Sequence, residues 1–172
     1  MKTALMLALL PLAAHAEPQP AVAALMQYMD ITSACFDGAE DSAEAGACVG
    51  QGATICMETE QDGYTTVGMM FCTLAENEAW DVLLNRDFGS YMEYARMGDD
   101  EMSALFPEFA NGADSLLAAQ RAWIPYRDAQ CALEYSLWGE GSMRQTAGAS
   151  CLMDMTAKRV IYLRFMTEKI RG

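Results

Sequence analysis

Apolar residues recur at intervals of three and four along most of the chain, which is the spacing of one buried face of an α-helix. Between Thr66 and Met97 this spacing continues almost without interruption. Sustained alternation of apolar and polar residues, the pattern of a half-buried strand, is missing. The helices predicted by this spacing cover residues 22–35, 53–61, 66–97, 111–138 and 142–170. We therefore predict an all-α fold, a helical bundle built from antiparallel helix hairpins.

Glycine, proline and acidic residues mark the segments between these helices. Residues 36–53 are rich in Gly, Ala, Asp and Glu, which predicts an irregular segment, and the Gly-Asp-Asp-Glu run at 98–101 predicts a polar loop. Pro125 lies inside the fourth predicted helix and should kink it, because proline has no N–H to donate to the preceding turn. The Gly-Glu-Gly run at 139–141 ends that helix. Ser142, followed by Gln three residues later, forms a capping-box pattern at the start of the last helix.

The first 16 residues have the composition of a secretory signal peptide. Met1-Lys2 is a short basic start, the segment 4–14 is apolar, and Ala14-His15-Ala16 matches the small-x-small cleavage pattern. No later apolar run is long enough to span a bilayer, and no cysteine follows the cleavage site to carry a lipid anchor. We therefore expect removal of the signal peptide at about Ala16 and export to the periplasm or the medium.

The chain has six cysteines, at positions 35, 48, 56, 72, 131 and 151. An even number in an exported chain is typical of a disulfide framework, although six cysteines allow 15 connectivities. Some of them could instead be free thiols in the core. We predict three disulfides that staple the helical bundle.

Spacing from the turns favours one pairing. Two antiparallel helices joined by a short turn bring residues equidistant from the turn to the same height. The midpoint of Cys131 and Cys151 falls in the glycine turn at 139–141, and the midpoint of Cys56 and Cys72 falls beside Asp62-Gly63. Cys35 and Cys48 then pair by elimination. Interleaved pairings remain open, and a linked peptide containing Cys56 and Cys131 would refute the local scheme.

Charge excludes several classes of function. Without residues 1–16 the chain of 156 residues has 24 acidic and 10 basic side chains, a net charge of −14, and no histidine. This composition excludes a catalytic or metal-ligating histidine and argues against nucleic-acid binding, which needs basic residues. We therefore expect no metal and no cofactor.

The charge is also uneven along the chain. Residues 17–114 carry 19 acidic and two basic side chains, whereas residues 115–172 carry five acidic and eight basic ones. Two acidic clusters are candidate partner contacts, although a solvated surface is the simpler interpretation of both. They are Asp99, Asp100 and Glu101, and Glu40, Asp41 and Glu44.

One face of the fourth predicted helix combines polar and aromatic residues. Its members lie at helical spacing: Gln120, Trp123, Arg127, Cys131 and Trp138. They could form a binding pocket. The interpretation that we favour is structural, with Arg127 partly buried, paired with an acidic residue and packed on an aromatic ring. Asp128 points away from this helix face and should be solvated.

This segment resembles the LprI-type lysozyme-inhibitor family of small exported bacterial proteins. The resemblance is carried by Gln-x-x-Trp-x-x-x-Arg-Asp-x-x-Cys at 120–131, then Gly141-Ser142, Cys151, Thr156 and Arg159. Weaker matches upstream are Cys56, Cys72, Glu76, Leu84-Asn85 and Leu116, so that the resemblance covers residues 56–166. Two features depart from the family pattern: Pro125, and the extra pair Cys35 and Cys48.

The resemblance implies an all-helical, disulfide-stapled domain. Because this motif lies in the near-neutral part of the chain, we expect its residues to build the scaffold: Gln120, Trp123, Arg127, Asp128, Cys131, Ser142, Cys151 and Arg159. The expected organisation is a signal peptide over 1–16, an N-terminal helix and acidic segment over 17–53, and an LprI-like domain over 54–172.

We therefore predict an exported acidic binding protein that inhibits a lysozyme-like muramidase by occluding its cleft. C-type lysozymes are basic and hold two catalytic carboxylates, so their field attracts an acidic protein. One alternative is a structural or stress-related envelope protein with another partner.

A second alternative is a copper binder, because 12 methionines remain after residue 16, among them Met69-Met70, Met153 and Met155. We do not expect an enzyme, because residues 17–172 contain no histidine and only Lys158 and Lys169 could activate a serine there.

Overall fold

The computed structural model describes residues 18–171, with side chains described as far as Met166, so the predicted signal peptide lies outside the described residues. The helices are α1 (Pro20–Leu25), the 3-10 turn η1 (Met26–Tyr28), α2 (Asp30–Gly38), α3 (Ser42–Ala47), α4 (Gln51–Thr59), α5 (Thr66–Ser103), the 3-10 turn η2 (Pro107–Phe109), α6 (Gly112–Leu137) and α7 (Arg144–Arg171). No strand occurs among the described residues, which confirms the all-α prediction.

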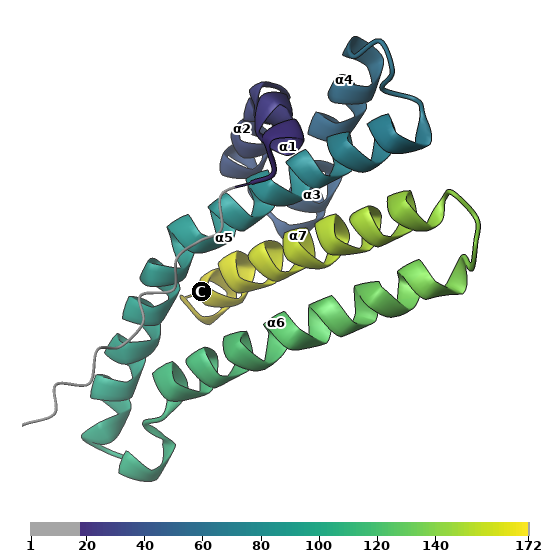
Figure 1. Ribbon diagram of the computed structural model, residues 1–172. Coiled ribbons are helices and arrows are strands. Elements are labelled where there is room, and N and C mark those ends of the chain that lie inside the picture. Colours follow the sequence, from purple (N-terminus) through teal and green to yellow (C-terminus); the bar gives the residue numbers. More distant parts are fainter. Residues whose placement is uncertain (1–17, 172) are drawn as a thin grey trace, which may run out of the picture.

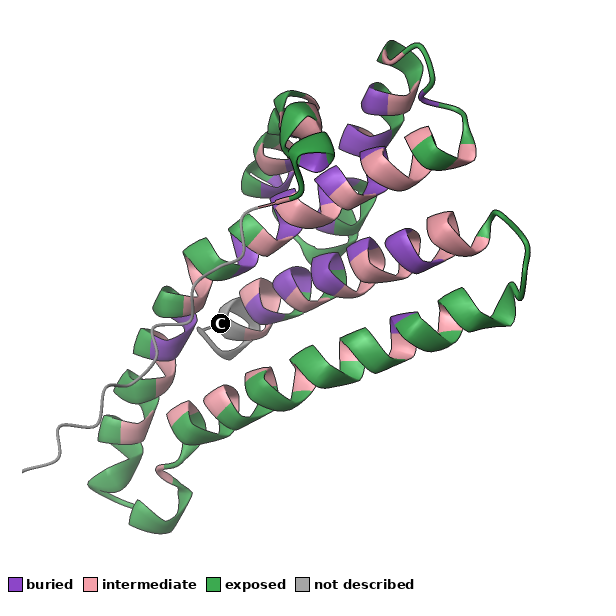
Figure 2. Ribbon diagram, viewed as in Figure 1, coloured by how far each residue is buried: buried purple, intermediate pink, exposed green. Residues whose placement is uncertain are grey.

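Three long helices form the body of the molecule. α7 lies between α5 and α6 and packs most extensively against α5 (Figure 1). The short helices α1 to α4 lie against α5 and α7, on the side away from α6 (Figure 1). α6 therefore has a helix neighbour on one side and solvent on most of the other, and Figure 2 shows it largely exposed.

The largest core cluster joins the N-terminal helices to the long ones. The Trp80 ring of α5 meets the Phe36 ring of α2 edge to face, with centroids 5.4 Å apart, and both are fully buried. Val160 and Leu163 of α7 complete the same cluster. At the edge of the same cluster, the Arg164 guanidinium of α7 donates to the carbonyl oxygens of Phe36 and Ala39 and thereby caps the end of α2. The segment before Cys56 thus shares its core with the family-like region.

Three disulfides join neighbouring helices. Cys35–Cys48 links α2 to the end of α3, Cys56–Cys72 links α4 to α5, and Cys131–Cys151 links α6 to α7. These are the pairs that the spacing from the turns predicts. Closing loops of this length contributes about 3 kcal/mol each in the chain-entropy account.

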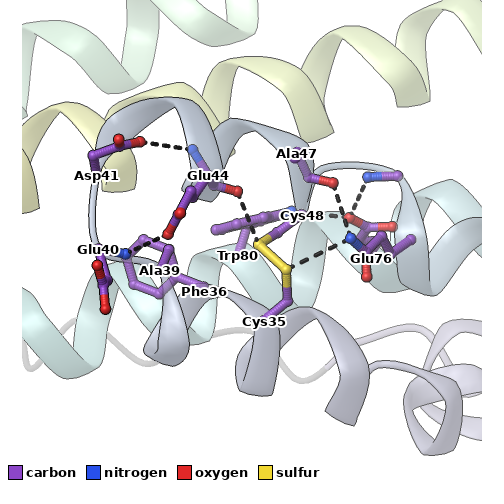
Figure 3. The surroundings of a disulfide bond; sticks show 12 residues. Cys35, Phe36, Ala39, Glu40, Asp41, Glu44, Ala47, Cys48, Glu76 and Trp80 are labelled. Atoms are coloured by element: carbon purple, nitrogen blue, oxygen red, sulfur yellow. Dashed lines mark hydrogen bonds between the residues drawn. A yellow bond between two sulfur atoms is a disulfide. The ribbon is translucent and has the colours of Figure 1, made fainter.

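The prediction of an irregular segment over residues 36–53 is wrong. This segment contains the end of α2, all of α3 and the start of α4. The Asp41 carboxylate accepts hydrogen bonds from the N–H groups of Ala43 and Glu44, and the Glu44 carboxylate accepts from the N–H of Glu40 (Figure 3). These contacts satisfy N–H groups that a six-residue helix otherwise leaves unpaired.

The prediction of a loop over residues 98–101 is also wrong, because α5 continues to Ser103. A helix tolerates glycine at a modest cost, and nothing in this run forces the chain to turn. The chain turns only at Leu105, just before Pro107. At Pro125, α6 continues through the proline without a break, and α7 begins at Arg144, two residues later than predicted.

Candidate partner-binding site

The family-like residues of α6 meet α7 at two arginines that flank one tryptophan. The guanidinium carbon of Arg127 lies 5.1 Å from the centroid of the Trp123 ring, and that of Arg159 lies 5.8 Å from it. A cation above an aromatic face is attracted by the negative face of the ring. Trp123 therefore holds a residue of its own helix and a residue of α7 together.

Arg159 contacts both Trp123 and Gln120. Its Nε donates to Oε1 of Gln120 at 2.8 Å, and its Nη2 is buried without a hydrogen-bond partner in the described part of the chain. Burial lowers the pKa of the Arg159 guanidinium. The half-buried cation thus lies among Trp123, Gln120 and the Tyr162 ring.

Arg127 connects all three long helices. Its Nη1 donates to Oγ1 of Thr156 on α7 at 3.4 Å, and that hydroxyl donates to Oδ1 of Asn77 on α5 at 2.9 Å. The guanidinium also pairs with Asp128 at 2.9 Å and lies 4.0 Å from Asp81. Only 17% of the Arg127 side chain is exposed, against 56% for Asp128. These contacts favour the structural interpretation of the motif.

The remaining motif residues lie along the α6–α7 hairpin. Cys131 and Cys151 form its disulfide, and Ser142 lies in the connecting turn, with its carbonyl accepting from the N–H of Gln145 at 3.5 Å. Trp138, predicted on the same face as Trp123, lies at the end of α6 and is half exposed.

A buried carboxylate in α5 has a role that the sequence analysis missed. Glu76 is fully buried, and its Oε1 accepts from the N–H of Gly50 at 2.7 Å and from Nε1 of Trp80 at 3.1 Å. Its Oε2 accepts from the N–H of Ala53 at 2.7 Å. Burial raises the pKa of Glu76, and these N–H donors oppose the shift in part. Glu76 therefore caps the start of α4 from a different helix (Figure 3).

The two predicted acidic clusters are partly used within the fold. Asp99 accepts from the N–H of Gly112 at 2.6 Å and of Ala113 at 2.8 Å, so it caps α6. The cluster around Asp41 caps α3 in the same way. Asp100 and Glu101 are exposed near the end of α5.

Residues 100–109, which we call the tip, are all exposed. They comprise the last turn of α5, a short turn and η2, and they lie at the end of the molecule remote from α1 to α4 (Figures 1 and 2). The exposed fractions are 75% for Leu105, 52% for Phe106 and 66% for Phe109. A cluster of exposed apolar side chains of this kind is typical of a protein-binding surface.

Two of the methionines considered as soft-metal ligands, Met153 and Met155, lie in or beside packed parts of the fold. Met153 is buried in the core, and Sδ of Met155 lies 3.7 Å from Sγ of Cys131 and 3.9 Å from Sγ of Cys151. Among the described residues no group of three or more His, Cys, Asp or Glu side chains could hold a metal ion. Within the same part of the chain, no helix is long and apolar enough to cross a membrane.

Comparison with known proteins gives one family and one relative. Residues 56–163 match the family model described as "Lysozyme inhibitor LprI". An uncharacterized protein of Rhizobium meliloti (strain 1021) is 32% identical over 97 residues, which are 56% of this chain and 70% of that protein. No solved structure matches the chain. The matched region contains the Trp123 cluster, two of the disulfides and the whole tip.

Proposed function

Because this chain belongs to the LprI lysozyme-inhibitor family, we propose that it is an exported acidic protein that binds a basic lysozyme and occludes its cleft. The proposal is supported above all by the composition of the tip. The tip combines exposed apolar side chains with exposed carboxylates, and it lies inside the family-matched region. The three disulfides fit a protein that works in an oxidising compartment outside the cytoplasm.

Charge supports a basic partner. The segment 93–114 contains six acidic residues and a single basic one, Arg96. An acidic surface speeds encounter with a cationic protein and disfavours anionic ones. Phe106 and Leu105 supply apolar area that becomes buried only in a complex, and this area is the part of the surface that gives affinity at physiological salt.

The test follows the rate of cell-wall lysis by a C-type lysozyme while the chain without residues 1–16 is titrated in, and measures complex formation by calorimetry. We expect saturable inhibition that persists at about 0.15 M salt, where the Debye length is about 8 Å. Binding that vanishes at that salt would indicate non-specific charge attraction, and no binding in the micromolar range would refute the proposal.

A matched pair of variants assigns the contact to the tip. Leu105→Ser combined with Phe106→Ser removes two exposed apolar side chains from the tip. Tyr64→Ser combined with Val67→Ser removes two similarly exposed side chains, one just before α5 and one in its first turn, at the end of α5 opposite the tip. We expect the first double variant to lose inhibition and the second to retain it. Equal inhibition by both would place the contact elsewhere on the surface.

A further inference from the structure

We propose that a cavity at the base of the tip receives an arginine side chain of the bound lysozyme. This inference rests on the proposed function, and it adds the kind of partner side chain that the site selects. The cavity, of about 360 Å³, is lined by the end of α5, η2, the start of α6 and the end of α7. Most of its wall is apolar or aromatic: Tyr91, Tyr94, Met97, Phe109, Leu116 and Met166.

Two carboxylates give the cavity its charge. Asp99 and Glu101 line it, and among the described lining residues none is basic. Asp99 is held in place because its two oxygens accept from the first N–H groups of α6, whereas Glu101 is exposed. The site therefore combines one fixed and one adjustable negative charge beside an apolar interior.

This combination suits arginine better than the other side chains of a basic protein. Arginine has an apolar stem of three methylene groups that can lie along Leu116 and Met166. Its planar guanidinium can stack on an aromatic ring and pair with a carboxylate. A lysine ammonium is more strongly hydrated and does not stack in this way. An anionic lipid would fill the apolar part but would bring its charged headgroup towards Asp99 and Glu101.

Two glycines of α5 provide a matched test. Gly98 lines the cavity, and Gly89 lies nine residues earlier on the same helix, outside it. A Cβ atom at either position meets no other atom within 4 Å, so neither substitution clashes with the backbone. Gly98→Leu adds a side chain to the wall of the cavity, whereas Gly89→Leu changes helix propensity by the same amount outside the cavity. Circular dichroism verifies that both variants fold.

We expect Gly98→Leu to weaken binding to a C-type lysozyme by about tenfold and Gly89→Leu to change it by less than about twofold. Glu101→Gln should weaken binding by about fivefold, because it removes one carboxylate from the cavity, and Glu93→Gln, an exposed acid on the same helix, should have less effect. Equal affinities for Gly98→Leu and Gly89→Leu would overturn the inference while leaving the proposed function intact. Absence of binding by the unmodified chain would instead refute the proposed function itself.

Binding measurements with acetylated lysozyme identify which lysozyme side chain enters the cavity. Acetylation neutralises lysine and leaves arginine charged, so the overall affinity falls but the ratio between the Gly89→Leu and Gly98→Leu affinities should stay the same. A ratio that falls to one with the acetylated protein would show that no arginine occupies the cavity, and would overturn the assignment.

Discussion

Replacing Glu76 by glutamine exchanges one carboxylate oxygen for an NH₂ group at a position where the three described hydrogen-bond partners are all donors. The two oxygens of Glu76 accept from the N–H groups of Gly50 and Ala53, each at 2.7 Å, and from the Trp80 indole. In Glu76→Gln, one of the two backbone N–H groups must face the amide NH₂, so a buried donor loses its acceptor. An unsatisfied buried donor costs about 1–3 kcal/mol, and hydrogen bonds to a charged acceptor are stronger than those to an amide.

We therefore expect Glu76→Gln to lower the free energy of unfolding by about 2–3 kcal/mol at pH 7. For a chain of this length the loss corresponds to a fall in Tm of about 4–12 °C. The assay is urea unfolding followed by circular dichroism at fixed pH, with the disulfides intact. Glu93→Gln, an exposed acid on the same helix, is the control and should change stability by less than about 0.5 kcal/mol. A Glu76→Gln variant as stable as the control would refute this account of the capping.

The free energies of unfolding of the wild type and of Glu76→Gln, measured as a function of pH, test the burial of Glu76. Its pKa in the folded chain is raised above the ordinary value of 4.5, so the folded state binds this proton more tightly than the unfolded state. The stability that Glu76 contributes is then fully present below that ordinary value, and it is lost as the pH rises through the folded pKa. Glutamine does not titrate. The difference in stability between the wild type and Glu76→Gln should therefore widen as the pH falls from 7 towards 4.5, and a difference that narrows would contradict the raised pKa.

Three further perturbations probe the rest of the fold. Trp123→Ala should lower the free energy of unfolding by about 2–4 kcal/mol, because it removes the ring that both arginines flank; thermal unfolding measures this. Asp99→Ala should cost about 1–2 kcal/mol and speed amide hydrogen exchange in the first turn of α6, whereas Asp100→Ala should change neither. Replacing Cys131 and Cys151 together by serine should cost about 3 kcal/mol in urea unfolding, and no loss would show that the hairpin needs no covalent link.

Local signals predicted the helices and the disulfide pairs because these features are determined within short stretches of the chain. The helix periodicity over 66–97 and the glycine turn at 139–141 lie within single hairpins, and the disulfide pairs follow from the symmetry of those hairpins. The same reasoning placed Trp123 and Arg127 on one face of α6, and the structure brings them together with Arg159 of α7.

The errors lie where a distant side chain or a local cap decides the conformation. The Gly-rich composition of 36–53 predicts no helix. The start of α4 is capped by Glu76, which accepts from the N–H of Ala53 although it lies 23 residues later in the chain. No pattern within the segment contains that information. The local signal that could have been used is Asp41 followed three residues later by Glu44, which is a capping pattern at the start of α3. At 98–101 the acidic composition predicts a loop, whereas Asp99 is a residue of α5 that caps α6.

The order of the disulfides along the chain has a consequence for how the protein matures. The first cysteine is bonded to the second, the third to the fourth and the fifth to the sixth. A chain that crosses a membrane with its N-terminus leading delivers these cysteines one pair at a time. An oxidase that joins each new thiol to the one that emerged just before it produces the native set without reshuffling. If the chain is exported as proposed, each hairpin can be locked before the next one has left the translocation channel, and the native pairs form without reshuffling by an isomerase.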